Sequence, residues 1–399
     1  MKKRFTTLFF FVSFLVAQAQ TWVQKSDFPG GGRTGAASFA IGNTAYVGLG
    51  AMGSNYFKDF WKYEAGTDTW TQVADFPGAS RSAVVAFVLN GKGYVGLGEV
   101  VSGTFSYFAD FYEYNPSTDT WTQMPDFTGG ARSRAVAFVI GGNAYVGSGK
   151  GSGSEAKDFF KFDGTSWSAA ASLSDAKART DAAAFAINGK GYISGGVKGV
   201  NGFTDMMQYD PVANAWTEKI FADANLSFQR AAAFAVNGKG YIFYGNKKIV
   251  SQYDPQTNGV TNLGDLLGNL GVYRRAPIAF ITNDKAYVGM GCAATSGLSC
   301  TEKMDLWQWS DLVEAKETVE PFLVKVKPTL VTNAFRLESN HPLPATNKLY
   351  LFSYAGQKLA SWTNITSGQS FDVYGLEPGY YHLQLKAGEK TFTEKIIKQ

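Results

Sequence analysis

A nine-residue segment recurs along the chain, and its spacing limits the possible folds more than any other feature. The segment NGKGYVGLG at 90–98 returns as NGKGYISGG at 188–196 and as NGKGYIFYG at 237–245. Its tyrosine marks six copies, 46 to 51 residues apart: Tyr46, Tyr94, Tyr145, Tyr192, Tyr241 and Tyr287. A period of this length is typical of β-propellers and related arrays, in which each copy is one structural unit.

Each copy keeps the same register around its tyrosine. A phenylalanine stands seven residues before the tyrosine and a glycine four residues after it in all six copies. An arginine stands thirteen residues before it in five copies: Arg33, Arg81, Arg132, Arg179 and Arg274. Because regular repetition suits a scaffold better than a site, we expect this arginine ring to be structural, bonding turn carbonyls and neighbouring repeats.

The pattern within each copy predicts four strands. In the second copy these are a small apolar strand at 82–89, a strand at 93–98 after an Asn-Gly type turn, and strands at 110–114 and 118–124. The sixth copy stops after LWQW (306–309), and the N-terminal TWVQKSDFPG (21–30) closely matches TWTQVADFPG (69–78). We therefore expect the strand around Trp22 to complete the sixth unit, which would protect the edges that an open array leaves bare.

These residues resemble the kelch repeat over roughly residues 20–311. The resemblance implies an all-β protein: a six-bladed kelch-type β-propeller closed by the N-terminal strand, followed by a small C-terminal β-sandwich. Kelch blades usually carry Gly-Gly after their second strand. Five copies depart from this pattern at the first glycine, with Leu49, Leu97, Ser148, Tyr244 and Met290, so we expect local variation there.

The two ends of the chain point to export. Residues 1–19 have a basic start, an apolar run and an A-x-A site, which predicts a signal peptide, and the run is too short to span a bilayer. After a linker at 312–326, residues 327–399 resemble the C-terminal sorting domain of the bacterial type IX secretion system, through KLYLFSYAGQKL (348–359), YGLEPGYYHLQL (374–385) and KTFTEKIIKQ (390–399). The resemblance implies transport through the periplasm and outer membrane to the cell surface or medium, with the secretion machinery as partner. An accessory β-domain without a sorting role is the alternative.

The chain lacks the residues that metal catalysis, a catalytic triad or nucleic-acid binding would need in the propeller. The only histidines, His341 and His382, lie in the tail, so the propeller has no histidine for a metal site or a catalytic triad. This excludes galactose oxidase, a kelch-propeller enzyme with histidine-ligated copper, and we expect no metal and no cofactor. The 37 basic and 33 acidic residues are too evenly balanced for a nucleic-acid binder. Cys292 and Cys300 are expected to form a local disulfide.

Candidate ligand contacts lie in the variable loops after the second strand of each blade. Two neighbouring loops concentrate aromatic residues that could stack on sugars or anchor a peptide, or could pack among themselves: Tyr56, Phe57, Phe105, Tyr107 and Phe108. Two residues after the ring-arginine position, which Phe228 occupies in the fifth copy, three consecutive blades carry Arg134, Asp181 and Arg230. These three could hold an anion at the channel mouth, or form a salt-bridge network between blades.

Three functions fit these observations. The favoured one is a non-catalytic binding module that recognises a glycan or protein on its loop-rich face. The second is a metal-free sugar mutarotase, because DFPGGGR (27–33) and the YVGLG strands look similar to bacterial sialic-acid mutarotases. In that case Arg134 and Arg230 would bind an anion, and Asp181 or Glu99 would exchange protons. The third is a structural surface or matrix protein.

Overall fold

The chain divides into two compact units, Met1–Val313 and Glu314–Gln399. The computed structural model describes residues 22–219, 230–245, 249–265, 273–294, 301–309, 324–327, 330–339, 343, 347–387 and 390–399. The predicted signal peptide (1–19) and most of the predicted linker (312–326) lie outside these residues. Nowhere in the described part is a helix long and apolar enough to cross a membrane.

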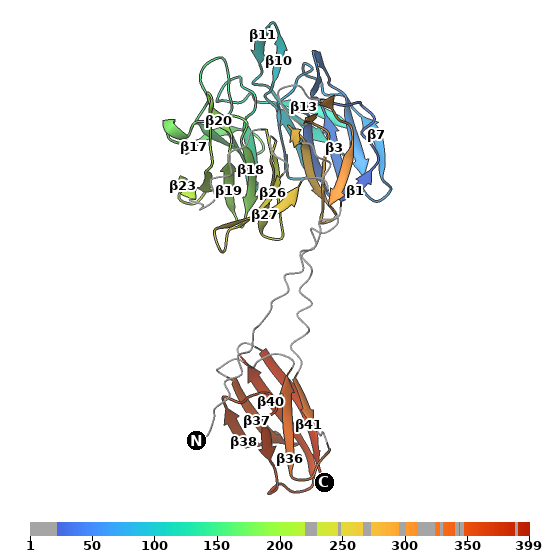
Figure 1. Ribbon diagram of the computed structural model, residues 1–399, viewed down its shortest axis with the longest axis vertical. Coiled ribbons are helices and arrows are strands. Elements are labelled where there is room, and N and C mark those ends of the chain that lie inside the picture. Colours follow the sequence, from blue (N-terminus) through green and yellow to red (C-terminus); the bar gives the residue numbers. More distant parts are fainter. Residues whose placement is uncertain are drawn as a thin grey trace, which may run out of the picture. The chain divides into compact units, whose positions relative to one another are not determined.

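Within its described residues, the first unit contains six four-stranded antiparallel sheets, the blades (Figure 1). From the innermost strand outward, the blades are β2 (Ala37–Ile41), β3 (Thr44–Gly48), β6 (Phe60–Glu64) and β7 (Thr69–Val73); β8 (Val85–Leu89), β9 (Lys92–Gly96), β12 (Phe111–Asn115) and β13 (Thr120–Met124); β14 (Val136–Ile140), β15 (Asn143–Gly147), β16 (Phe159–Phe162) and β17 (Trp167–Ala170); β18 (Ala183–Ile187), β19 (Lys190–Ser194), β22 (Met206–Asp210) and β23 (Ala215–Lys219); β24 (Ala232–Val236), β25 (Lys239–Phe243), β26 (Ile249–Asp254) and β27 (Gly259–Asp265); β29 (Ile278–Thr282), β30 (Lys285–Gly289), β33 (Leu306–Trp309) and β1 (Trp22–Lys25). Each innermost strand contacts the innermost strand of the next blade, and β29 contacts β2. The all-β, kelch-type propeller fold predicted from the repeats is confirmed.

The sixth blade joins the two ends of the propeller sequence. Strand β1 pairs antiparallel with β33, with Trp22 opposite Trp309. The two indole rings stack with their centroids 5.4 Å apart and their planes 23° apart. The blade therefore takes three strands from the end of the repeat region and one from its start.

The repeated NGKGY segment is explained by packing between blades. In each blade the phenylalanine of the innermost strand stacks on the tyrosine of the next strand, as Phe39 does on Tyr46 at 5.2 Å. The phenylalanine also presses against the following blade at the glycine before its tyrosine: a Cβ added to Gly93 would lie 2.2 Å from the Phe39 ring. Such a distance leaves no room for a larger side chain, so the segment keeps a small residue there.

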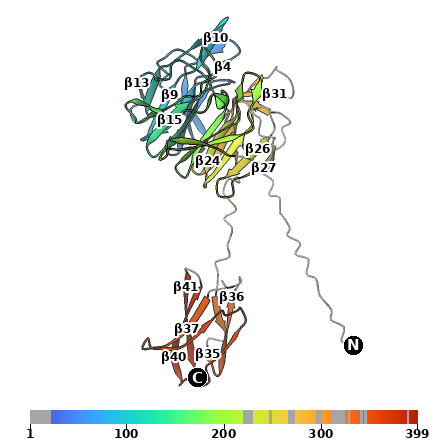
Figure 2. The same ribbon diagram turned by 90° about the vertical axis from the view of Figure 1, so that its left-hand side faces the viewer.

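Short elements fill the loops between the second and third strands of the blades, and one of them, β28, precedes the first strand of the sixth blade. They are β4 (Ala51–Met52) with β5 (Asn55–Tyr56), β10 (Glu99–Ser102) with β11 (Thr104–Tyr107), β20 (Val197–Lys198) with β21 (Asn201–Gly202), and β28 (Tyr273–Arg275) with β31 (Cys292–Ala294) and β32 (Thr301–Glu302). A 3₁₀ turn, η1, covers Asp175–Lys177. Figures 1 and 2 show the β10–β11 hairpin projecting beyond the blade strands. Cys292 is disulfide-bonded, and Cys300, the only other cysteine, lies outside the described residues.

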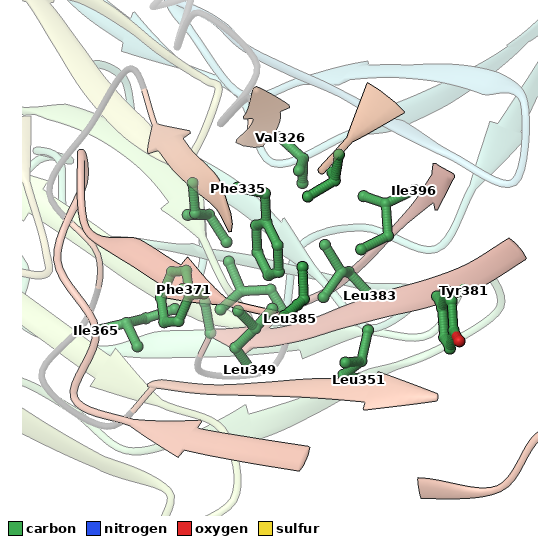
Figure 3. Close-up of a cluster of buried hydrophobic side chains, with 14 residues drawn as sticks. Val326, Phe335, Leu349, Leu351, Ile365, Phe371, Tyr381, Leu383, Leu385 and Ile396 are labelled. Atoms are coloured by element: carbon green, nitrogen blue, oxygen red, sulfur yellow. The ribbon is translucent and has the colours of Figure 1, made fainter. Parts of the chain in front are cut away.

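The second unit is the predicted β-sandwich. One sheet contains β34 (Val324–Lys327), β36 (Ala334–Ser339) and β39 (Ser370–Asp372), and the other contains β35 (Leu330–Val331), β41 (Lys390–Lys398), β40 (Gly379–Ala387), β37 (Asn347–Ser353) and β38 (Lys358–Thr363). Alternate residues of β40, including Leu383 and Leu385, are buried against Phe335 and Phe371 (Figure 3). This unit therefore has a hydrophobic core of its own.

Candidate ligand-binding site

A belt of backbone hydrogen bonds surrounds one end of the central channel. It connects the residues two positions after the ring-arginine position of each blade, and in five places the N–H of one blade donates to the carbonyl of the preceding blade: Ala83 to Gly35, Arg134 to Ala83, Asp181 to Arg134, Arg230 to Asp181 and Ala276 to Arg230, at 2.9 to 3.3 Å. All six residues have a φ between 47° and 64°. The belt is a property of the fold, since alanines and charged residues alike adopt this left-handed conformation.

The charged residues of the belt line a cavity of about 300 Å³ at the channel mouth. The cavity, named here the mouth cavity, brings Arg134, Asp181 and Arg230 together, as their shared register predicts. Glu99 and Tyr56 also line it, together with small residues such as Gly35, Ala83 and Ala276. The charged side chains of the cavity therefore come from blades two to five, and blades one and six contribute only uncharged residues.

The four charged side chains form one network. Arg134 donates from Nη2 to Glu99 Oε1 at 2.6 Å, and its Nη1 lies 3.5 Å from Asp181 Oδ2. Arg230 Nε lies 3.5 Å from Asp181 Oδ1. The Asp181 side chain is 8% exposed, whereas that of Arg230 is 40% exposed. Arg230 is thus the cation of this network that is most accessible to a ligand.

The surroundings of the network shift the pKa of Asp181 and that of Arg134. Burial raises the pKa of Asp181 above its ordinary value of 3.8, although the charges of Arg134 and Arg230 oppose the shift. For Arg134, burial alone would lower the pKa, but the charges of Asp181 and Glu99 outweigh it and raise the pKa. A buried carboxyl with a raised pKa can hold and release a proton closer to neutral pH than an exposed one.

Glu99 is held in place by the backbone and by two donors. Its N–H and C=O pair with those of Ser82, next to the belt residue Ala83. Its Oε2 accepts a hydrogen bond from Ser133 Oγ at 2.6 Å, and its Oε1 accepts from Arg134. The sequence suggested Glu99 only as an alternative proton carrier, because a single glutamate at the start of a variable loop carries no repeat signal.

The arginine ring lies outside this cavity and is buried. Each ring arginine donates from Nη1 to the carbonyl sixteen residues later and pairs with an aspartate that directly precedes the third strand of its own blade: Arg33 with Asp59, Arg81 with Asp110, Arg132 with Asp158, Arg179 with Asp205 and Arg274 with Asp305. The carbonyl of the ring arginine accepts from the neighbouring blade, as Arg81 does from the Gly50 N–H at 2.9 Å. These contacts leave the guanidinium groups almost no surface for a ligand.

The five candidate aromatic residues fall into two groups. Phe57 and Phe108 cover ring arginines: their ring centroids lie 4.0 Å from the Arg33 guanidinium carbon and 3.7 Å from that of Arg81. Tyr56 lines the mouth cavity and accepts a hydrogen bond at its hydroxyl from the Val101 N–H.

Phe105 and Tyr107, the other two candidates, line a second cavity beside the β10–β11 hairpin. Three of the five aromatic residues therefore stand at cavities, and two pack onto the arginine ring.

In the part of the chain that the structure describes, no three His, Cys, Asp or Glu side chains lie together so that they could hold a metal ion. The mouth cavity offers two carboxylates, those of Glu99 and Asp181, and both pair with arginines. Such a set suits the recognition of an anion or the transfer of protons.

Comparisons with known proteins agree with this architecture. Residues 25–125 match the sequence model of the N-acetylneuraminate epimerase family, and residues 326–399 match that of the secretion system C-terminal sorting domain. The solved structure titled "Structure of YjhT", a kelch-type propeller, aligns with a TM-score of 0.58 and 18% identity, over 69% of this chain and 95% of that one. No curated protein matches the chain.

These findings establish the organisation of the protein. A kelch-type propeller carries the mouth cavity, and a type IX sorting domain follows it and directs export through the periplasm and outer membrane. The epimerase match spans the first two blades and includes Glu99, but it ends before Arg134, Asp181 and Arg230.

Proposed function

We propose that the protein is an exported, cofactor-free mutarotase that interconverts the anomers of an acidic sugar of the N-acetylneuraminate type. The observation that carries the proposal is the mouth cavity, where two carboxyl groups and two guanidinium groups meet. The family match to N-acetylneuraminate epimerase over residues 25–125 supports the choice of this reaction over binding alone.

The reaction requires proton transfers and no redox step. A base removes the proton of the anomeric hydroxyl while an acid protonates the ring oxygen, and the bond between the anomeric carbon and the ring oxygen breaks to give the open-chain ketone. Rotation beside the carbonyl and closure on its other face, with both proton transfers reversed, give the second anomer. Atoms and charge are unchanged overall, so one acid and one base suffice.

The residues of the cavity fit these roles. Asp181, whose pKa burial raises, is the acid that protonates the ring oxygen. Glu99 is the base, held by Ser133 and Arg134 so that its carboxylate keeps one orientation. Arg230, with the most exposed cationic side chain of the network, pairs with the sugar carboxylate through its remaining guanidinium donors.

The test is anomer exchange followed by NMR. A single anomer of N-acetylneuraminate is mixed with the full mature chain, and its return to equilibrium is compared with the rate in buffer. Wild-type protein is expected to accelerate exchange, and Asp181→Asn or Glu99→Gln to reduce the rate constant by roughly 100-fold or more. Asp175→Asn, at an exposed position outside the cavity, serves as the matched control and should leave the rate unchanged.

The pH profile adds a second readout. The rate should fall as the pH rises through the raised pKa of Asp181, because the acid loses its proton there. This fall in rate with rising pH should be missing in Asp181→Asn. Exchange at the buffer rate would end the proposal. If the sugar still bound under those conditions, the cavity would serve as a binding site without turnover, the function that the sequence alone favours.

A further inference from the structure

A second cavity of about 380 Å³ adjoins the mouth cavity. The two share Glu99 and Arg134 in their walls, and the second is completed by Phe105, Tyr107, Lys150 and Ser152. Its volume lies in the range of small-molecule sites, roughly 300–1,000 Å³. A ligand seated in the mouth cavity could therefore continue past the Glu99–Arg134 pair into the second one.

The aromatic wall of the second cavity stands on the projecting β10–β11 hairpin (Figure 1). Phe105 is 55% exposed, and its ring stacks on that of Tyr107 with the centroids 5.9 Å apart and the planes 9° apart. Phe57 and Phe108, in contrast, cover buried arginines. Two parallel rings at the edge of a polar cavity offer a flat apolar surface of the kind that packs against the C–H face of a sugar.

Lys150 supplies a further cation to the lining of the second cavity. In each of the first four blades, the residue after the ring arginine forms an isolated antiparallel bridge with a residue that follows the second strand. These second-strand partners are Ala51, Glu99, Lys150 and Val197. Lys150 is thus the counterpart of Glu99 in the next blade. Its ammonium group lies 3.4 Å from Glu155, and its side chain is 43% exposed. The Glu155 side chain is only 10% exposed, but it also accepts a hydrogen bond from the Gly199 N–H, so Lys150 can turn to an incoming anion while Glu155 keeps a partner.

We propose that the second cavity is a subsite for a second acidic sugar. The preferred ligand is an acidic disaccharide or longer oligosaccharide. Its reducing-end residue occupies the mouth cavity, and the next residue packs on Phe105 and Tyr107 with its carboxylate at Lys150. This assignment deepens the proposed function and rests on it for the residue in the mouth cavity.

The experiment compares N-acetylneuraminate with its dimer, linked through a side-chain hydroxyl so that one anomeric hydroxyl remains free. Affinities for the full mature chain are measured by NMR titration. The dimer should bind more tightly than the monomer. Phe105→Ala should weaken dimer binding roughly threefold to tenfold and leave both monomer binding and monomer anomer exchange unchanged. Lys150→Met should likewise reduce the affinity for the dimer alone. Tyr374→Ala, which removes a 75% exposed aromatic ring from the sorting domain, is the matched control.

The outcomes separate the subsite from the catalysis. Equal affinity for monomer and dimer, equal weakening of both by Phe105→Ala, or no binding of either sugar would each overturn the subsite. Dimer binding that depends on Phe105 without accelerated anomer exchange would leave the subsite in place and remove the mutarotase. Monomer exchange without any preference for the dimer would do the reverse.

Discussion

The belt at the channel mouth illustrates how one backbone conformation serves different residues. A left-handed φ costs an ordinary L-residue about 1–2 kcal/mol, and only glycine adopts it freely. Gly35 occupies the position in the first blade, whereas Ala83 and Ala276 adopt the same conformation without a charged group to contribute. The fold imposes the conformation, and the three charged residues add chemistry to it.

This comparison predicts a stabilising substitution. Ala83→Gly should raise the free energy of unfolding by about 0.5–1 kcal/mol. The strain that a φ of 54° imposes on alanine is relieved in glycine, and this relief exceeds the cost of the entropy that glycine loses on folding. Ala86→Gly, three residues along in strand β8, is the matched control and should lower it. Thermal melting of both variants measures the difference. A destabilised Ala83→Gly variant would show that the belt tolerates alanine without strain.

A second prediction concerns the ring pair of Arg179 and Asp205. Burial alone would raise the pKa of Asp205, but hydrogen bonds and charge from Arg179 and Lys177 outweigh it and lower the pKa below 3.8. The carboxylate therefore stabilises the fold above pH 3.8, and this contribution is lost as the pH falls further. Asp205→Asn should cost about 3 kcal/mol at pH 7, because it leaves a buried arginine without its anion.

The control for this prediction is Asp126→Asn, which changes an exposed carboxylate outside the arginine ring. Melting curves between pH 2 and pH 7 should show a smaller loss of stability at acid pH for Asp205→Asn than for the wild type, and a nearly unchanged loss for Asp126→Asn. Equal acid sensitivity of Asp205→Asn and the wild type would contradict the assignment.

At the scale of residues, the sequence predicts where a side chain lies in its blade better than it predicts which side chain it contacts. The shared register of Arg134, Asp181 and Arg230 predicts that they meet, and they do line one cavity. The aspartates that pair with the arginine ring were missed, although each directly precedes the third strand of its blade. Phe57 and Phe108 were open to both a binding and a packing interpretation, because exposure depends on which neighbour covers a side chain.

At the scale of strands, the fixed spacing of the repeats predicts almost all of the strand positions. Six phenylalanine–tyrosine pairs at fixed spacing fix which residues face the neighbouring blade, so strand positions follow from the sequence. Four of the five departures from Gly-Gly did not change the backbone: Leu49, Leu97, Ser148 and Met290 keep a left-handed φ of 53° to 60° where a kelch blade usually has glycine. Propensity alone could not have shown that the fold would override it there.

Strand β1 offers a test of ring closure. Trp22 stacks on Trp309 and meets the Phe243 ring of the fifth blade edge-on at 6.0 Å. Trp22→Ala should therefore lower the free energy of unfolding of the propeller by about 3 kcal/mol. Val23→Ala, at a 42% exposed position of the same strand, is the control and should have little effect. Chemical denaturation followed by tryptophan fluorescence measures both, and equal stabilities would contradict a closing role for β1.

At the scale of the whole molecule, each of the two units has a hydrophobic core of its own. The sorting domain closes its two sheets around Phe335, Leu383 and Ile396 (Figure 3). Its motifs were readable from sequence because alternating strands and a basic last strand are local signals. The ligand was not readable, because it depends on side chains brought together from four blades.

Removal of residues 314–399 should separate export from folding. The truncated chain is expected to stay inside the outer membrane, because it lacks the sorting domain, while its propeller keeps the melting temperature of the full chain. Fractionation of the producing bacterium and circular dichroism of the purified chain provide the two readouts. A truncated protein that still reached the surface would show that the tail is an accessory domain.

The pairing of β1 with β33 also determines when the propeller can be finished. Residues 22–25 have no strand to join until residues 306–309 are present, so completion waits for nearly the whole repeat region. Contacts between such distant residues form slowly, and until then β33 offers an open edge to any other strand. Only Gln20 and Thr21 separate the predicted cleavage site from this strand. If the predicted leader at 1–19 were retained, it would continue directly into the strand that closes the sixth blade, so we expect its removal and the closure of the propeller to be coupled steps.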